Sequence, residues 1–520
     1  MNWPSKNVES GAFALGGAIL SGVLQVLVFP RWSLAWLAPF CLVPLLLAVK
    51  EQRARDRWLL GWLAGSVFFG GTCYWIYPVM RDYASISPPI AAFLFVLFFL
   101  VKGVQCGAFA LLGAPLLQRA WAVPGLATLW VALEGSHQYV FFTWTLLGNA
   151  AVELPLSHIA RLAPWTGVYG PSLVFALANA SVAVAIVRKS PKPLIALVPL
   201  LGLLAVPPLP SDGETEHTAR LVQPNVHPDI VRAGWIQEHG TNHLSKMLQI
   251  SRAPTGDRRP LLLVWPEYPV SAYFFDDAAA RAYFERVAME SGSAFIFNTI
   301  SFEDGDRSRP RNSSVTLGRD GRLLADYSKV HLVPFGEFVP WPFHYFVTKI
   351  TLQAGMFRPG EAISTALIDG HGVGTFICYE SVFGGFVREF TAAGAQLLVN
   401  ISNDSWYGRS AAREQHLLIA QMRAIENDRW ILRATNDGIT AAISPAGRVV
   451  SRLPSYVQDY MDVPFGFRST TTAFVRHGEW LWWLCLLAAG VCVTYRRAVG
   501  HRASIRPRGK GRLRQVWRSR

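Results

Sequence analysis

The chain is poor in cysteine, poor in charge, and lacks acidic residues at its C-terminal end. Between residues 211 and 478 it has one cysteine, Cys378. A lone cysteine excludes an internal disulfide there, and no Cys/His cluster in the chain has the spacing of a metal site. The thiol of Cys378 therefore needs another explanation. The other cysteines all lie in apolar runs, at Cys41, Cys73, Cys106, Cys485 and Cys492.

Charged residues make up only 16% of the chain, and hydrophobic residues make up 51%. The first 210 residues hold seven apolar runs, and an eighth follows near the other end. Runs of this length cross a hydrocarbon core of ~30 Å, whereas runs of about 10 to 14 residues are more often buried core helices. Seven runs in series favour a membrane domain, although the fifth is short. The runs are 11–30, 32–49, 58–79, 90–117, 123–133, 166–187, 193–209 and 480–495.

Basic residues follow every second run, which indicates the orientation of the chain. They occur at 50–57, at Arg119, at 188–192 and in the C-terminal tail. By the positive-inside rule this side is the cytoplasm. The first run is too long, and lacks the cleavage pattern, for a removed signal peptide.

We therefore predict four parts. These are a membrane domain at 1–210 with about seven transmembrane helices, an extracytoplasmic domain at 211–478, a C-terminal transmembrane helix at 479–496, and a basic cytoplasmic tail at 497–520.

The net charge of +14 belongs mostly to the tail. The last 25 positions hold ten lysines or arginines, so the charge without them is +4 (14 − 10). A segment that binds anionic lipid headgroups and a solvated tail that only fixes the topology explain it equally well. Neither explanation involves a nucleic-acid partner.

The block from 211 to 478 alternates short apolar strands with helical patterns, which predicts mixed sheets covered by helices. Its helices are expected at 239–250, 277–290, 384–393 and 411–426, the last with one apolar stripe. Its strands are expected at 220–223, 261–265, 294–300, 314–317, 322–327, 374–378, 396–401, 430–434 and 440–443.

Three strand ends carry reactive side chains. Glu267 follows the apolar run 261–265, Lys329 follows 322–327, and Cys378 ends 374–378. A carboxylate, an ammonium and a thiol suffice for acyl transfer, because they supply a base, an oxyanion stabiliser and a nucleophile. Taken singly, each residue has a simpler explanation. Cys378 could be an inert thiol that fills space in the core, and Glu267 could be an acid near the start of a helix. Lys329 could be half of a surface ion pair worth under about 1 kcal/mol.

The order of Glu267, Lys329 and Cys378 resembles the nitrilase (carbon-nitrogen hydrolase) superfamily, which has a Glu-Lys-Cys triad on an αββα sandwich. A proline precedes the glutamate, and Tyr379 and Glu380 follow the cysteine. The apolar runs and the segment 329–340, Lys-Val-His-Leu-Val-Pro-Phe-Gly-Glu-Phe-Val-Pro, are similar to the apolipoprotein N-acyltransferase family. The segments 221–225, 400–408 and 433–440 match it as well.

Two places depart from that family. Gly-Ser-His follows Glu134 where an arginine is expected nearby, and Asn436-Asp-Gly438 replaces Asn-Thr-Gly. The departures concern lipid contact and the loop beneath the site, and they leave the three reactive residues in place.

The resemblance implies roles for seven residues. Cys378 would be the nucleophile, Glu267 the general base and Lys329 the stabiliser of the tetrahedral intermediate. Four more residues would support the site: Glu337, Tyr379, Glu380 and Trp235. Trp235 would sit on a mobile arm over the site, and an exposed aromatic on an interfacial loop explains it equally well.

The implied activity is transfer of an acyl chain from a glycerophospholipid, through a cysteine thioester, to the N-terminal amine of a diacylated apolipoprotein. It needs neither cofactor nor metal, and it places the enzyme in the bacterial inner membrane with the catalytic domain in the periplasm. A membrane-anchored amidase and a non-catalytic membrane scaffold or transporter are the alternatives.

Overall fold

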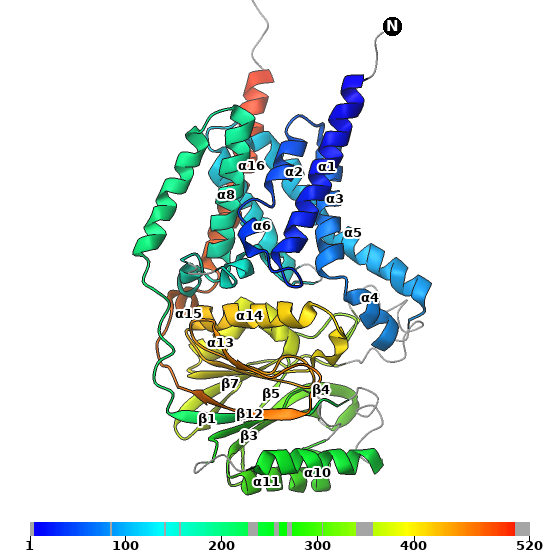
Figure 1. Cartoon of the computed structure of the whole chain (residues 1–520), viewed down its shortest axis with the longest axis vertical. Coiled ribbons are helices and arrows are strands. Elements are labelled where there is room, and N and C mark those ends of the chain that lie inside the picture. Colours follow the sequence, from blue (N-terminus) through cyan, green and yellow to red (C-terminus); the bar gives the residue numbers. More distant parts are fainter. Residues whose placement is uncertain are drawn as a thin grey trace, which may run out of the picture.

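The computed structural model describes residues 5–83, 86–139, 142–154, 158–226, 238–253, 259–267, 273–303, 305–339 and 357–504. Its apolar helices gather at one end and its two sheets at the other (Figure 1). The first turns of α1 (Ser5–Val28) and the last turns of α16 (Trp480–Ser504) lie at the end of the helical part that faces away from the sheets (Figure 1). The predicted combination of a helical membrane domain and an α/β sandwich is confirmed.

Three segments of the described chain are long and apolar enough to cross a membrane, namely Gly11–Val28, Pro88–Leu116 and Tyr169–Arg188. The pair Ala54–Thr72 and Ile76–Asp82, bent by 64°, adds a fourth if it is one span. Our count of eight spans stays a prediction. The helices of this part are α1 (Ser5–Val28), α2 (Val43–Val49), α3 (Ala54–Thr72), α4 (Ile76–Pro78), α5 (Pro88–Gly113), α6 (Ala122–Gly135), α7 (Ala163–Thr166), α8 (Tyr169–Arg188), the 3-10 helix η7 (Lys192–Ala205) and α16.

The apolar run 32–49 does not form one helix. A 3-10 turn at Ala35–Leu37 and the short α2 replace it. Pro39 and Pro44 explain the break, because proline lacks an N–H donor and clashes with the preceding turn, so it is tolerated only where a helix begins. Pro44 lies in the first turn of α2.

Two six-stranded sheets form the other end of the molecule. The first has the order β12-β1-β2-β3-β4-β5 and the second β11-β10-β9-β8-β7-β6. Both are mixed, as predicted: β1, β2 and β3 are parallel, as are β7, β8 and β9, and the outer strands are antiparallel. The strands of the first sheet are β1 (His217–Gln223), β2 (Leu262–Val264), β3 (Ala294–Glu303), β4 (Asp306–Leu317), β5 (Leu323–Ser328) and β12 (Asp459–Phe465). Those of the second are β6 (Thr365–Ile368), β7 (His371–Ile377), β8 (Leu397–Ser402), β9 (Ile431–Thr435), β10 (Ala441–Ile443) and β11 (Val449–Arg452).

The sheets stack face to face and a helix pair covers each outer face, α10 (Glu238–Arg252) with α11 (Ala278–Ser291) and α13 (Gly384–Ala392) with α14 (Ala412–Asn427) (Figure 1). Alternation along the strands explains this packing, since successive side chains point to opposite faces. In β3, Phe295 and Phe297 pack with Phe284 of α11, whereas Ile296 joins the core shared with the second sheet.

Helix α14 also contacts the membrane helices. Nε2 of Gln415 donates to the carbonyl oxygens of Pro30 at 2.6 Å and Thr72 at 3.1 Å, and its Oε1 accepts from the Trp144 indole at 2.7 Å. One buried side chain of the sandwich thus bridges three segments of the helical domain.

Candidate active site

Cys378 is the first residue after β7, at the start of the 3-10 helix η8 (Cys378–Val382). Its φ is 50°, in the left-handed region that residues with a Cβ rarely adopt. The side chain is 4% exposed. The thiol therefore leaves the carboxyl end of a parallel strand on a sharp turn, as expected from the run that ends in Cys-Tyr-Glu.

Glu380 holds this turn against the loop after β5. Its Oε2 accepts from the Ile377 N–H at 2.7 Å, and its Oε1 accepts from the Tyr327 hydroxyl at 2.5 Å and the Val330 and His331 N–H groups at 2.7 and 3.1 Å. Burial raises the pKa of the Glu380 carboxyl to about 7, and the four donors that point at its two oxygens favour the carboxylate form and oppose that shift. Glu380 therefore joins the cysteine turn to the loop that carries Lys329.

Lys329 lies in the interior, with 1% of its side chain exposed. Its Nζ is 3.2 Å from Oε1 of Glu267 and 3.0 Å from Oε1 of Glu337. Burial disfavours the ammonium, but the two glutamates outweigh burial and raise the pKa of Lys329 above its usual range. The alternative of a surface ion pair is wrong, because this lysine is a buried cation held by two carboxylates.

Glu267, 2% exposed, follows β2. Its Oε1 accepts from Asn312 Nδ2 at 2.8 Å as well as from Lys329, and its Oε2 accepts from the Asn403 N–H at 3.0 Å. Burial raises the pKa of the Glu267 carboxyl, and the Lys329 ammonium works against that shift. A carboxylate of this kind can accept a proton from a neighbouring group.

The charges of Glu267 and Lys329 both change the pKa of the Cys378 thiol. Burial, and after it the charge of Glu267, raise the pKa of the thiol, the charge of Lys329 opposes them, and the resulting pKa is about 12. The resting thiol is therefore protonated at neutral pH, and a nucleophilic role would require a base during attack. The structure brings a carboxylate, an ammonium and a thiol into one buried electrostatic system.

Asn312 was not singled out from the sequence. It lies in β4, and its Nδ2 is 2.8 Å from Oε1 of both Glu267 and Glu337. Its backbone carbonyl accepts from the Lys329 N–H at 2.8 Å. The strand predicted at 314–317 stops short of Asn312, so nothing in the sequence indicated that this amide lies inside a sheet, where an amide is unfavourable unless it has partners.

A second buried network lies beside Cys378 and was also missed. Asp404, at the start of the 3-10 helix η9 (Asp404–Tyr407), contacts Arg433 of β9 and His416 of α14, with distances of 2.9 Å to Arg433 Nη2 and 3.2 Å to His416 Nδ1. The segments 400–408 and 433–440 matched the family in sequence, but spacing did not indicate that His416 would join them.

Tyr379 points toward the helical domain rather than toward Lys329. Its hydroxyl donates to the Thr143 carbonyl at 3.1 Å and accepts from the Thr143 N–H at 3.2 Å. Its ring stacks with Phe142 and Trp144, with centroid distances of 5.7 and 6.5 Å. The residue after the cysteine thus fixes the site to the helical part. Trp235 lies outside the described residues.

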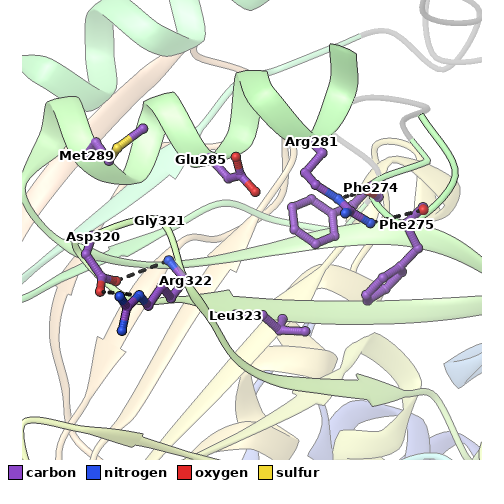
Figure 2. Close-up of a pocket in the computed structure, with 9 residues that line it drawn as sticks. All are labelled: Phe274, Phe275, Arg281, Glu285, Met289, Asp320, Gly321, Arg322 and Leu323. Carbon is purple, nitrogen blue, oxygen red and sulfur yellow. Dashed lines mark hydrogen bonds and ion pairs between the residues drawn. The ribbon is translucent and has the colours of Figure 1, made fainter. Parts of the chain in front are cut away.

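A cavity of about 440 Å³ lies between α11 and the turn that joins β4 to β5 (Figure 2). Phe274, Glu285 and Arg322 are among its lining residues, and none of the six predicted site residues that the structure describes is. The cavity is therefore separate from the candidate site. Within the described part of the chain, no group of three His, Cys, Asp or Glu side chains is placed to hold a metal ion.

Known proteins match both parts of the chain. Residues 21–181 match a model of the apolipoprotein N-acyltransferase N-terminal domain, and residues 219–463 match one of carbon-nitrogen hydrolases. A Nesterenkonia amidase from the nitrilase superfamily, of known structure, matches with a TM-score of 0.36 and 18% identity over 57% of this chain and 99% of that one.

Full-length relatives match as well. The chain is 32% identical over 519 residues to the apolipoprotein N-acyltransferase of Geobacter metallireducens, covering 93% of this chain and 96% of that one. It is 30% identical over 482 residues to that of Pseudomonas putida, covering 88% and 91%. With such identity over nearly its whole length, the chain belongs to the apolipoprotein N-acyltransferase family of membrane-bound acyltransferases.

Proposed function

We propose that this protein transfers an acyl chain from a glycerophospholipid to the N-terminal amine of a diacylglyceryl-cysteine apolipoprotein through a thioester on Cys378. One observation carries the proposal. The buried Lys329 ammonium lies 3.2 Å from the Glu267 carboxylate, and both charges act on the Cys378 thiol. Nucleophile, base and cation are the set that acyl transfer needs.

In the first half-reaction, Sγ of Cys378 attacks the ester carbonyl carbon of the phospholipid while Glu267 takes the thiol proton. The oxyanion that forms is stabilised by the Lys329 ammonium. When the C–O bond breaks, Glu267 returns its proton to the leaving oxygen and a lysophospholipid departs. The pKa of about 12 for the Cys378 thiol supports this order, because little thiolate exists before the substrate arrives.

In the second half-reaction, the α-amino group of the apolipoprotein attacks the thioester carbonyl. Glu267 accepts a proton from the nitrogen, Lys329 again stabilises the oxyanion, and the C–S bond breaks to give an amide. The Cys378 sulfur leaves as thiolate and regains a proton from Glu267. Water must stay out of the site between the halves, since hydrolysis would waste the acyl group.

The remaining predicted residues have supporting roles in this proposal. Glu337 keeps Lys329 charged and in place, with 3.0 Å between Nζ and Oε1. Glu380 holds the cysteine turn on the lysine loop, and Tyr379 fixes it to the membrane domain. Trp235 covers the site as part of the arm expected at that position. The reaction uses no metal or other cofactor.

We also propose a bacterial inner-membrane location, with the sandwich in the periplasm and the divisions at residues 210, 478 and 496 kept as predicted. The predicted basic tail begins in the last turns of α16, whose end lies on the side of the helices away from the sheets (Figure 1). The positive-inside rule puts that side in the cytoplasm. The acyl donor would then come from the outer leaflet, next to the sandwich.

Intact-mass measurement tests the first half-reaction. The purified protein is incubated with mixed micelles of a dioleoyl glycerophospholipid, and the expected product is an oleoyl adduct that hydroxylamine removes. Cys378→Ala should form none, whereas the matched control Cys492→Ala, which removes a cysteine of α16, should form it normally. A native protein without an adduct contradicts the proposal and favours a non-catalytic scaffold.

Discharge of the adduct tests the second half-reaction. Addition of a synthetic diacylated lipopeptide should move the oleoyl group to the peptide amine. Release of free oleate alone, at the same rate with and without the lipopeptide, would instead indicate a membrane-anchored amidase.

A further inference from the structure

The buried pair of Asp404 and His416 lies beside the reactive cysteine, yet the imidazole faces the backbone and not the sulfur. Nε2 of His416 is 3.1 Å from the carbonyl oxygen of Cys378 and 2.7 Å from Oγ of Ser381. The His416 side chain is fully buried. An Asp-His-Cys relay, in which the histidine takes the thiol proton, therefore does not describe this contact.

The protonation of the ring follows from its neighbours. Burial opposes ionisation of Asp404, but Arg433 outweighs burial, with help from His416, and the pKa of the Asp404 carboxyl lies well below its usual range. Burial and the Arg433 guanidinium lower the pKa of His416. The network thus holds an ionised carboxylate, a guanidinium and a neutral imidazole.

A neutral imidazole carries one hydrogen, and the contacts favour Nε2 as its position. The carbonyl of Cys378, 3.1 Å from Nε2, can only accept. Nδ1 faces both a donor, Nη2 of Arg433 at 3.0 Å, and an acceptor, Oδ1 of Asp404 at 3.2 Å. That oxygen already accepts from Arg433 at 3.0 Å and from the Ser402 hydroxyl at 2.9 Å, so it does not need the imidazole hydrogen. Nδ1 as the acceptor leaves the hydrogen on Nε2, where the Cys378 carbonyl and Ser381 Oγ can accept it. The opposite tautomer would set an imidazole lone pair against that carbonyl oxygen.

The carbonyl of Cys378 belongs to a strained turn. With φ at 50°, the cysteine occupies a conformation that a residue with a Cβ holds only where its surroundings enforce it. Glu380 fixes the turn from the preceding Ile377 N–H at 2.7 Å, and His416 contacts the carbonyl that follows the cysteine Cα. The two contacts bracket the reactive residue.

We propose that His416 is a positioning residue for acyl transfer, which, as the Nε2–H tautomer selected by Arg433, donates to the Cys378 carbonyl and holds the nucleophile in its left-handed turn. The inference rests on the proposed role of Cys378 as nucleophile. His416 exchanges no proton with the substrate. Its contribution is to the geometry of attack, in which an error of about 1 Å costs on the order of 10²-fold in rate.

Two substitutions separate the contacts of the ring. The side-chain amide of His416→Gln reaches the position of Nε2, whereas the shorter His416→Asn reaches only that of Nδ1. Single-turnover oleoylation of Cys378 in dioleoyl phospholipid micelles should be within about 3-fold of native for the Gln variant and about 10²-fold slower for the Asn variant. The phospholipid concentration for half-maximal rate should stay unchanged in both variants. The thermal midpoint should fall by a similar amount in both, because each variant leaves one side of the buried network without a partner.

Ser381→Ala tests the tautomer. With the hydrogen on Nε2, loss of the serine leaves the contact with the Cys378 carbonyl intact, and oleoylation should proceed at the native rate. A loss as large as that of His416→Asn would mean that Nε2 accepts from the serine, and would overturn the assignment.

The remaining outcomes are distinguishable. Equal slowing of the Gln and Asn variants, or slowing in proportion to a lowered thermal midpoint, assigns His416 a structural role and overturns the inference while leaving the proposed function intact. Native protein that forms no adduct overturns both.

Discussion

The ammonium of Lys329 lies 3.0 Å from Oε1 of Glu337, so the cation beside Glu267 is itself held by a second carboxylate. Two acids share one buried cation, and Asn312 donates to both of them at 2.8 Å. The charge on each member of this cluster therefore depends on the others.

Glu337→Gln should shift the pH dependence of oleoylation. The charge of Glu337 raises the pKa of Glu267, so its removal lowers that pKa. Because Glu267 acts as a base only when deprotonated, the acid limb of the single-turnover rate should move to lower pH. The maximal rate should fall by about 10²-fold, because Lys329 loses one of the two carboxylates that hold its ammonium in place. The exposed control Glu290→Gln should change neither, and an acid limb that moves to higher pH would contradict the coupling.

Glu267→Gln should make Cys378 more acidic and yet abolish turnover. The glutamate's charge raises the thiol pKa of about 12, so the amide should lower that pKa while removing the base. Acyl transfer should fall by roughly 10²- to 10⁴-fold. Alkylation of Cys378 by iodoacetamide, followed by peptide mass between pH 8 and 11, should be faster at each pH than in the native protein, because more of the thiol is ionised. An unchanged or slower alkylation would mean that the two groups do not interact.

Asn312→Asp should destabilise the protein more than Asn312→Ala does. Either change removes the donor shared by Glu267 and Glu337, at a cost of about 1 to 3 kcal/mol. The aspartate also places a third carboxyl group among two buried acids, whose repulsion is weakened only when one of them is protonated. Chemical unfolding in detergent at pH 5 and pH 8 should show the larger difference between the variants at pH 8. A difference that is the same at both pH values would argue against a third charge.

Gln415→Leu should loosen the contact between sandwich and membrane helices. It leaves the Trp144 indole and the carbonyls of Pro30 and Thr72 without this partner, at about 1 to 3 kcal/mol for each group that stays unsatisfied. Thermal unfolding in detergent should show a lower midpoint than for the control Gln421→Leu, which removes one hydrogen bond, to Gly447, from the same helix. Equal midpoints would show that water replaces the lost bonds.

The strands and helices that bear the site could be predicted from local pattern. All nine predicted strands and four predicted helices of the sandwich occur, because their apolar periodicity reflects their own burial. The strands β6, β11 and β12 were missed. They lie in the outer part of their sheets, and in β11 and β12 few residues are fully buried, so their alternation is weak.

The parts of the site that sequence did not predict depend on partners distant in the chain. The role of Asn312 depends on its hydrogen bonds to Glu267 and Glu337, which lie near it only in the folded sandwich. His416 is comparable, since its partners come from η8, η9 and β9. Contacts between side chains that are distant in the chain produce no periodic pattern in the sequence.

Helix α14 was predicted to have one apolar stripe, with arginine and glutamate on its other faces. In the structure 14 of its 16 residues are buried, including Arg413, Gln415 and Glu426. Sheet and membrane helices enclose it from opposite sides, so its polar groups find partners in both. We therefore expect the sandwich to depend on its membrane helices. Without them it would expose an apolar face with hydrogen-bonding groups that have lost their partners, and a truncated form of this protein should aggregate.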